Sequence, residues 1–422
     1  MHTRLRTFVC NNDVYMKRFP LYLQILAALV LGILAGTFLP ETTRYYSWIG
    51  TLFMNALCML IVPIIFFSVS LSIVDIRAGG AGGLKRIGTK TIVWYVITML
   101  LAITTGLLLV NLIHPGRGIT VAPGEVPELV STTTVPDIIA GFIPSNIIYA
   151  FAHNNTIPVI FLAIVGGIAI PTLKDKSKET LTDFMRAGYE LTMKVTKVVI
   201  SLAPIGIFAI VAGQFAQIEN VWLMLRNMLL YVVTVAAGLL IHTLVTLPLL
   251  LRLVGKVRPW AHLRNMSLPM VTAFSTASSG ATLPLTLEAV EKKDGVSRKI
   301  ADFVVSLGAT VNMNGAALLE CVAVIFIAQV YGIELTLFQM ITISFLSLVC
   351  AIGAAGIPMS AMVMMAIILS AVGLPVEGIG LVIGVDRILD MCRTAVNVYG
   401  DTCIAVLVAK SEKEQTTIDI KQ

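Results

Sequence analysis

The chain has 422 residues, of which 57% are hydrophobic and only 13% are charged. A mean hydropathy of +0.90 leaves too little polar surface for a soluble protein of this size, so the composition predicts a multi-pass membrane protein and argues against a soluble enzyme. The net charge of +6 comes from Lys and Arg between apolar segments. The positive net charge therefore reflects the membrane topology, and no nucleic-acid partner is expected.

Eight apolar segments are predicted to span the lipid bilayer as helices, which need about 20 residues each. They are residues 21–39, 49–74, 92–113, 156–171, 198–215, 223–250, 300–330 and 375–408. The fourth is short and is expected to continue back into residues 138–151. The fold class is therefore an all-α membrane protein.

Lys and Arg fix the predicted orientation. They cluster on alternate connections, at residues 4–18, 77–90, 174–178, 252–264 and 292–299 and after residue 410. The positive-inside rule then places both termini in the cytoplasm of a protein in the cell (inner) membrane. Residues 1–20 form a cytoplasmic N-terminus, and the polar tail 411–422 is expected to be disordered.

Two apolar segments are interrupted by small and polar residues. Residues 269–289 contain STASSGAT, and residues 341–372 contain AIGAAGIPMSA. Their flanks predict two re-entrant helical hairpins that enter from opposite sides, as in the inverted repeats of secondary transporters. A third break is predicted at residues 308–315, because two glycines and two asparagines disfavour an unbroken helix.

A stripe of polar residues crosses the last span. With about 100° of rotation per residue, its members fall within an arc of roughly 80° and extend about 22 Å along the helix. They are Asp386, Asp390, Arg393, Asn397 and Asp401. Ionisable groups in a membrane cost about 2.5–3.5 kcal/mol each, so they indicate a pathway for ions or substrate. Internal salt bridges are the alternative, and we favour them for Asp386 and Arg387.

The residue types indicate an anionic substrate that also carries an amine. Arg393 offers a planar fork for a carboxylate, and Asp390 suits an ammonium group. Ser278, Ser279 and residues 356–359 are candidates for holding a second carboxylate. Carbonyls of the broken seventh span, with Asn312, Asn397 and Asp401, form an oxygen-rich cage suited to Na⁺.

From about residue 21 to residue 410 the chain resembles the dicarboxylate/amino acid:cation symporter family, the glutamate transporters. The motifs that carry the resemblance are AFSTASSGATLP, GATVNMNGAALLE, AAGIP and DRILDMCRTAVNVYGD. The resemblance implies a homotrimer, with scaffold helices in 21–74 and 114–222, the latter after an external loop. Residues 75–113 and 223–410 would form a transport domain that moves as an elevator.

The resemblance also implies roles for individual residues. The implied substrate contacts are Ser278, Ser279, Asp390, Arg393, Thr394 and Asn397. The residue types of the second hairpin add Gly356 as a further candidate. One sodium site would use Gly308, Asn312, Asn397 and Asp401. A second would use carbonyls at Thr310, Ala351, Ile352 and Ala354. No cofactor is implied, and the coupling ion is Na⁺, with H⁺ as a second candidate.

Three departures from the family pattern are informative. The usual NMDGT reads NMNGA, so Asn314 and Ala316 replace an aspartate and a threonine of a third sodium site, which is expected to be weak or absent. Glu320 stands where proton-carrying members have glutamate. It is therefore a proton-coupling candidate, and a permanently protonated core residue is the alternative. Ala277 replaces the arginine of the first hairpin.

The expected function is import of aspartate or glutamate by symport with Na⁺, in which a proton is a further candidate. The alternatives are a proton-coupled glutamate/C4-dicarboxylate symporter and a passive ion channel. An intramembrane aspartyl enzyme is disfavoured because Asp390 and Asp401 lie about 16 Å apart on one helix. The expected partners are the acidic amino acid, the bilayer and two further copies of the chain.

Overall fold

The computed structural model describes residues 21–78, 83–118, 143–153, 156–216, 221–353 and 360–420. Within these ranges the elements are helices, and the β-structure is one isolated bridge between Val257 and Asp419. The chain forms two groups of helices that pack mainly among themselves, with contacts between the groups at α2 and α18.

The first group lies around α2. It consists of α1 (Leu21–Phe38), η1 (Pro40–Tyr45), α2 (Ser47–Ala78), α5 (Ile147–Ala152), α6 (Thr156–Ala169), η2 (Ile170–Thr172), α7 (Asp175–Ser201) and α8 (Ala203–Phe215). Helix α1 packs along α8, and α2 packs against α6, α7 and α8. Glycine permits the close crossing of α1 and α8, because a Cβ at Gly36 would lie 2.4 Å from the carbonyl oxygen of Ala212.

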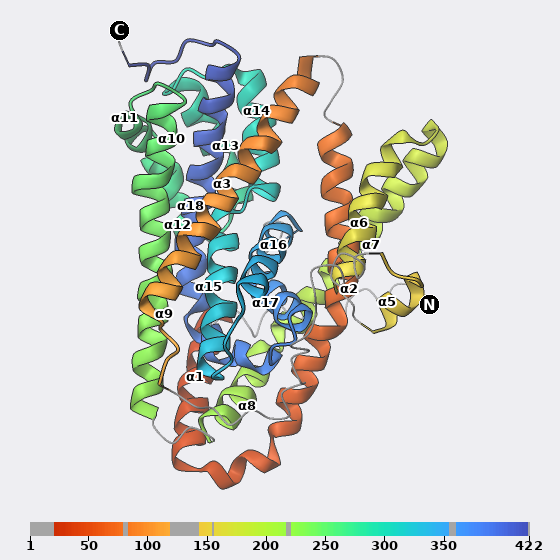
Figure 1. The fold of residues 1–422 in the computed structure, drawn as a ribbon, viewed down its shortest axis with the longest axis vertical. Coiled ribbons are helices and arrows are strands. Elements are labelled where there is room, and N and C mark those ends of the chain that lie inside the picture. The colour runs from red at the N-terminus through yellow and green to blue at the C-terminus, as the bar shows by residue number, and fades with distance from the viewer. Residues whose placement is uncertain are drawn as a thin grey trace, which may run out of the picture.

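The second group surrounds α15. Its elements are α3 (Gly83–Ile113), α9 (Val221–Ile241), η3 (His242–Thr246), α10 (Leu247–Leu253), α11 (Pro259–Asn265), α12 (Ser267–Thr276), α13 (Ser279–Lys292), α14 (Arg298–Val311), α15 (Asn314–Val330), α16 (Leu337–Gly353), α17 (Ser360–Ala371), η4 (Val376–Gly378) and α18 (Ile379–Ser411). Every residue of α15 except Gln329 is buried. The helix contacts α3, α9, α16 and α18, and Figure 1 shows it at the centre. An apolar helix buried on all sides is a core element.

The interrupted segments form helix pairs. Helices α12 and α13 meet at Ala277, which has a φ of 48°, and Ser278 caps α13 by accepting a hydrogen bond from the Ala281 amide. Helices α16 and α17 flank residues 354–359, which lie outside the described part of the chain. The predicted break in the seventh span is confirmed, because α14 ends at Val311 and α15 begins at Asn314.

By length and hydropathy, four of the described helices can cross a membrane, or five if the bent α7–α8 pair is one span. Shorter apolar helices include α1, α6, α16 and α17. Helix α18 is 33 residues long but carries two aspartates and two arginines in its first half. The fold is therefore that of an α-helical membrane protein, and the expected total of eight spans is taken up below as a proposal.

The structure differs from the sequence expectations in two places. Residues 175–197 are helical and carry nine charged side chains, so the predicted span at 198–215 begins in the last turn of α7 and bends by 57° before α8. Pro204 at the start of α8 explains the interruption, because it lacks an amide hydrogen. The tail is also ordered through residue 420. Glu412 pairs with Arg86 and Lys90, and Ile418 is buried.

Candidate substrate and cation site

The polar stripe of α18 is buried. Its five residues have exposed fractions between 1% and 4%. The first half faces the broken seventh segment, because the start of α15 packs directly on the backbone of Arg393. A Cβ at Gly315 would lie 2.7 Å from the Arg393 carbonyl oxygen, so glycine is required for this approach. Asn397 stabilises the same contact between α15 and α18 by accepting a hydrogen bond from the Gly315 amide at 2.7 Å.

The two residues expected to bind the charged ends of the substrate are paired with each other. Arg393 Nε donates to Asp390 Oδ1 at 2.7 Å, and Arg387 Nη1 donates to Asp390 Oδ2 at 3.3 Å. Arg393 Nη1 has no hydrogen-bond partner within the described residues. Thr394 donates to the Asp390 carbonyl at 2.7 Å. An entering amino acid would therefore find an unused guanidinium donor beside a carboxylate.

The expected salt bridge of Asp386 is not formed as a hydrogen-bonded pair. Both carboxylate oxygens of Asp386 lack a hydrogen-bond partner in the described ranges, although the side chain is buried. Arg387 points its Nη1 to Asp390 instead. Arg393 and Arg387 still interact with Asp386 electrostatically, so it belongs to the same charged cluster.

The end of the stripe that is expected to bind a cation lies at Asp401. Asn312, in the break between α14 and α15, donates to Asp401 Oδ1 at 2.8 Å. A Cβ at Gly308 would lie 2.4 Å from the same oxygen, so only glycine leaves room beside the carboxylate. Of the four residues expected in the first sodium site, Gly308, Asn312 and Asp401 are thus directly adjacent. Asn397 is one turn before Asp401 on α18.

The region expected to correspond to a third sodium site carries amide side chains where the family pattern has a carboxylate. Thr98 Oγ1 lies 3.5 Å from Asn312 Oδ1 and 3.4 Å from Asn314 Oδ1, and all three side chains are buried. Asn314 Nδ2 has no partner among the described residues. An amide supplies one oxygen but no negative charge, so it neutralises a buried cation less well than a carboxylate.

Glu320 lies deep in α15. It is fully buried, and neither carboxylate oxygen has a hydrogen-bond partner in the described part of the chain. Arg393 and Asp386 interact with it electrostatically, which places it beside the substrate end of the stripe. An ionised carboxylate without hydrogen bonds is costly to bury.

The remaining predicted residues lie on the helix pairs. Ser278 caps α13, and Ser279 is buried next to it, on a pair that packs against α18. Ala351 and Ile352 are in the last turn of α16, and Thr310 is in the last turn of α14, which packs on α16. Carbonyls at helix ends lack intrahelical partners, as a second cation site requires. Gly356 and Ala354 lie outside the described residues.

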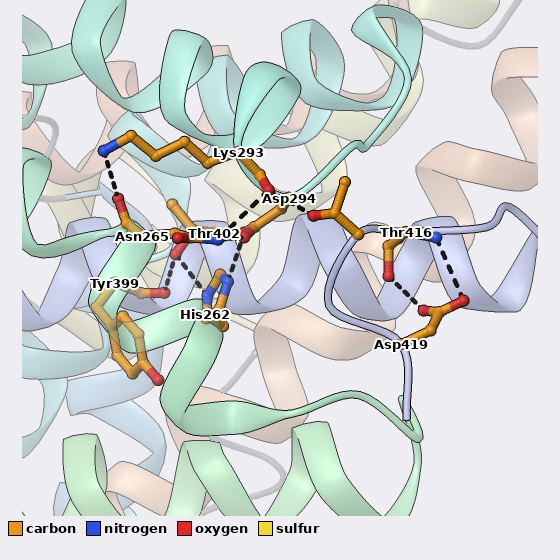
Figure 2. Close-up of polar contacts among 9 residues, drawn as sticks. His262, Asn265, Lys293, Asp294, Tyr399, Thr402, Thr416 and Asp419 are labelled. Carbon is orange, nitrogen blue, oxygen red and sulfur yellow. Dashed lines mark hydrogen bonds and ion pairs between the residues drawn. The ribbon is translucent and has the colours of Figure 1, made fainter. Parts of the chain in front are cut away.

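One polar cluster was not anticipated from the sequence. His262, Asp294 and Thr402 are fully buried, and His262 forms hydrogen bonds with both Asp294 and Thr402, next to Asp401 on α18 (Figure 2). Its members come from segments separated by 32 and 140 residues. No spacing pattern brings such residues together, so sequence periodicity gave no signal for this cluster.

Opposite charges, amides and an unpartnered carboxyl group inside a bundle of apolar helices define a membrane transporter of a charged solute. Groups of this kind are costly in lipid and are found in membrane proteins where substrates and ions pass. The broken α14–α15 segment is typical of the same class, because irregular backbone is tolerated there only where it is buried or lines a cavity.

Comparison with known proteins identifies the family. Residues 21–411 match the sodium:dicarboxylate symporter family. The chain is 34% identical to the proton/glutamate-aspartate symporter of Escherichia coli (94% of this chain, 93% of the relative). It is 32% identical to excitatory amino acid transporter 3 of Mus musculus (97% and 89%) and 31% identical to an excitatory amino acid transporter of Caenorhabditis elegans (93% and 88%). The chain belongs to the sodium:dicarboxylate symporter family, a family of transporters and not of enzymes.

Proposed function

We propose that the protein is a secondary active symporter that imports an acidic amino acid, aspartate or glutamate, together with Na⁺. The observation that carries the proposal is the buried Asp390–Arg393 pair, in which Arg393 Nη1 has no partner within the described residues. When a substrate with an ammonium group and a side-chain carboxylate binds, the Asp390–Arg393 pair is replaced by two ion pairs. Asp390 then pairs with the ammonium group and Arg393 pairs with the carboxylate. Each buried charge then keeps a partner of opposite sign.

The pair also supports the choice among substrates. A neutral amino acid has no side-chain carboxylate to bind Arg393, and a C4-dicarboxylate has no ammonium group to bind Asp390. Both losses leave polar groups unpaired in a buried site, which is the strongest basis for discrimination. The Escherichia coli relative is named a proton/glutamate-aspartate symporter, and the other two are named excitatory amino acid transporters, which agrees with this choice.

The sodium ions are proposed to bind at the two sites that the family resemblance implies. The adjacency of Gly308, Asn312 and Asp401 supports the first site. The packing of α14 on α16 supports the second, between Thr310 and Ala351–Ile352. The third site is proposed to be weak or absent, because Asn314 and Ala316 provide neither the carboxylate nor the hydroxyl.

Proton coupling is a second candidate, and Glu320 favours it. The buried carboxyl group has no hydrogen-bond partner in the described ranges and lies in the electrostatic field of Arg393. The Escherichia coli relative is named a proton/glutamate-aspartate symporter. A carrier that loads a proton on Glu320 with each substrate would keep this carboxyl neutral while Arg393 binds the substrate carboxylate.

The assembly is proposed to follow the family. Eight spans and two re-entrant hairpins, α12–α13 and α16–α17, would place both termini in the cytoplasm at the inner membrane. The group around α2 would be the scaffold of a homotrimer, and the group around α15 would be the moving transport domain. The separate packing of the two groups supports this division.

Uptake by the purified protein in liposomes tests the proposal. Inward gradients of Na⁺, H⁺ or both, with K⁺ inside or absent, are imposed, and the accumulation of labelled amino acids is measured. Aspartate or glutamate should accumulate under the Na⁺ gradient, while serine, alanine and succinate should not. Accumulation of a neutral amino acid would overturn the substrate assignment. Accumulation under the proton gradient alone would replace Na⁺ with H⁺ as the coupling ion.

A further inference from the structure

A buried polar cluster connects the first helix pair with α18. His262 lies on α11 before α12, Asp294 lies in the turn after α13, and Thr402 follows Asp401 on α18 (Figure 2). Each of the three is 0% exposed. The cluster therefore connects the start of α12 and the end of α13 to the turn of α18 that carries the cation-site carboxylate.

The hydrogen bonds of the cluster centre on the His262 ring. His262 Nδ1 lies 2.6 Å from Asp294 Oδ2, and His262 Nε2 lies 3.1 Å from Thr402 Oγ1. Thr402 Oγ1 donates to the Tyr399 carbonyl at 2.7 Å. Asn265 Nδ2 donates to the other oxygen of Asp294 at 2.7 Å.

These contacts determine how many protons the pair holds. The Thr402 hydroxyl has one hydrogen, and the shorter contact to Tyr399 uses it, so Thr402 accepts from His262 and Nε2 must carry a hydrogen. The contact of Nδ1 with Asp294 needs another hydrogen between the two atoms. The pair therefore contains one proton more than a neutral imidazole beside an ionised carboxylate.

Loss of that proton would reverse a hydrogen bond. The remaining hydrogen would stay on Nδ1 and point to Asp294, so Nε2 would become an acceptor. The Thr402 hydroxyl would then have to rotate from the Tyr399 carbonyl to His262. The change takes place one residue from Asp401 and in the same helical turn.

The titratable and charged groups around the pair come from several elements. The other titratable groups that face the imidazole are Tyr399, whose ring lies 5.3 Å from that of His262, and Cys403 on the same helix. Lys293 is exposed and donates to the Asn265 carbonyl. The cations nearby on α10 and before α11 are exposed, namely Arg252, Lys256 and Arg258. The C-terminal segment covers Asp294, whose carbonyl accepts from the Thr417 amide at 2.9 Å.

We propose that His262 and Asp294 are a proton-binding pair that positions Asp401 through Thr402. Cation affinity then depends on pH at the end of the protein where the C-terminal segment lies, which is the expected cytoplasmic side. The inference rests on the proposed cation role of Asp401 and adds a regulating proton that is distinct from any proton on Glu320.

The test compares the Na⁺ dependence of aspartate uptake at an internal pH of about 6 and about 8, with the external pH constant. In the wild type, the apparent Na⁺ affinity should be about three- to tenfold higher at the lower pH, the equivalent of one hydrogen bond. Asp294→Asn keeps the shape of the side chain, and its amide can donate a hydrogen bond to His262 Nδ1. The hydrogen on Nε2 then points to Thr402 at both pH values. The affinity of this variant should equal the low-pH value at both pH values.

Thr402→Val tests the link independently, because it removes the hydroxyl and keeps the volume. It should abolish the pH dependence even if Asp294→Asn fails to fold. His153→Gln, at an exposed histidine on another element, should behave like the wild type. Wild-type pH dependence in Asp294→Asn or in Thr402→Val would overturn the inference, and so would its absence from the wild type. Uptake that does not depend on Na⁺ at all would instead refute the cation site, and the inference with it.

Discussion

Gly308→Ala is the sharpest test of the cation site. The added Cβ would lie 2.4 Å from Asp401 Oδ1 and 3.0 Å from the Tyr95 hydroxyl. An ordinary contact between these atoms is about 1 Å longer, so the carboxylate must withdraw by about that distance. The substitution should therefore weaken cation binding without removing any ligand.

The magnitude follows from Coulomb's law. A hard cation binds a carboxylate oxygen at about 2.4 Å. Moving the oxygen to about 3.4 Å at an effective dielectric constant of about 20 costs about 2 kcal/mol. This corresponds to an apparent Na⁺ affinity about 30-fold lower.

The assay is the Na⁺ concentration dependence of aspartate uptake into liposomes, together with a thermal melt in detergent. Gly213→Ala on α8 is the matched control, because its Cβ would meet no atom within 4 Å. It should leave the Na⁺ dependence unchanged. A Gly308→Ala protein that melts like the wild type and retains wild-type Na⁺ affinity would refute the assignment of Asp401 to the cation site.

Four further predictions concern other residues. Arg393→Cys should lower aspartate uptake by at least about 30-fold, because it leaves Asp390 without its buried partner, and neutral amino acids should begin to compete; unchanged selectivity would argue against the substrate assignment. Glu320→Gln should make uptake independent of external pH, whereas a wild-type pH profile would leave Glu320 as a structural residue. Asn314→Asp with Ala316→Thr should add a further Na⁺ to the transport stoichiometry, and a wild type that already moves three per substrate would contradict the weak third site. Hydrogen bonds from Arg86 and Lys90 lower the pKa of Glu412 to about 2. The ionised carboxylate therefore stabilises the folded state above its ordinary pKa of about 4.3, and this stabilisation is lost as the pH falls toward 2. Glu412→Gln should accordingly lower the melting temperature at pH 7 and have little effect near pH 2.

Much of the site follows from helical periodicity. Asp390, Arg393 and Asp401 fall on one face of any helix. Because charged groups are costly in lipid, that face can be predicted to be functional before the fold is known. The break at residues 312–313 is equally visible, because glycines and asparagines weaken the helix where α14 ends. Ser278 is a residue type that favours helix N-termini, which agrees with its capping of α13.

The rest depends on contacts between distant segments. The Glu412–Arg86 ion pair joins residues 326 positions apart, and it holds in place a polar tail whose composition indicates disorder. The His262–Asp294 pair likewise joins the two ends of the first helix pair. The helix at residues 175–197 gives no signal in a search for apolar spans, because it carries nine charged side chains.

The central claim is that Na⁺ and an acidic amino acid move together. The most direct measurement is the entry of radioactive sodium into liposomes that contain the protein, with and without external aspartate. Sodium should enter only when aspartate is present, should saturate with its concentration, and should lose its aspartate-dependent component in Arg393→Cys. Sodium entry of the same size without aspartate would contradict the account and indicate a channel.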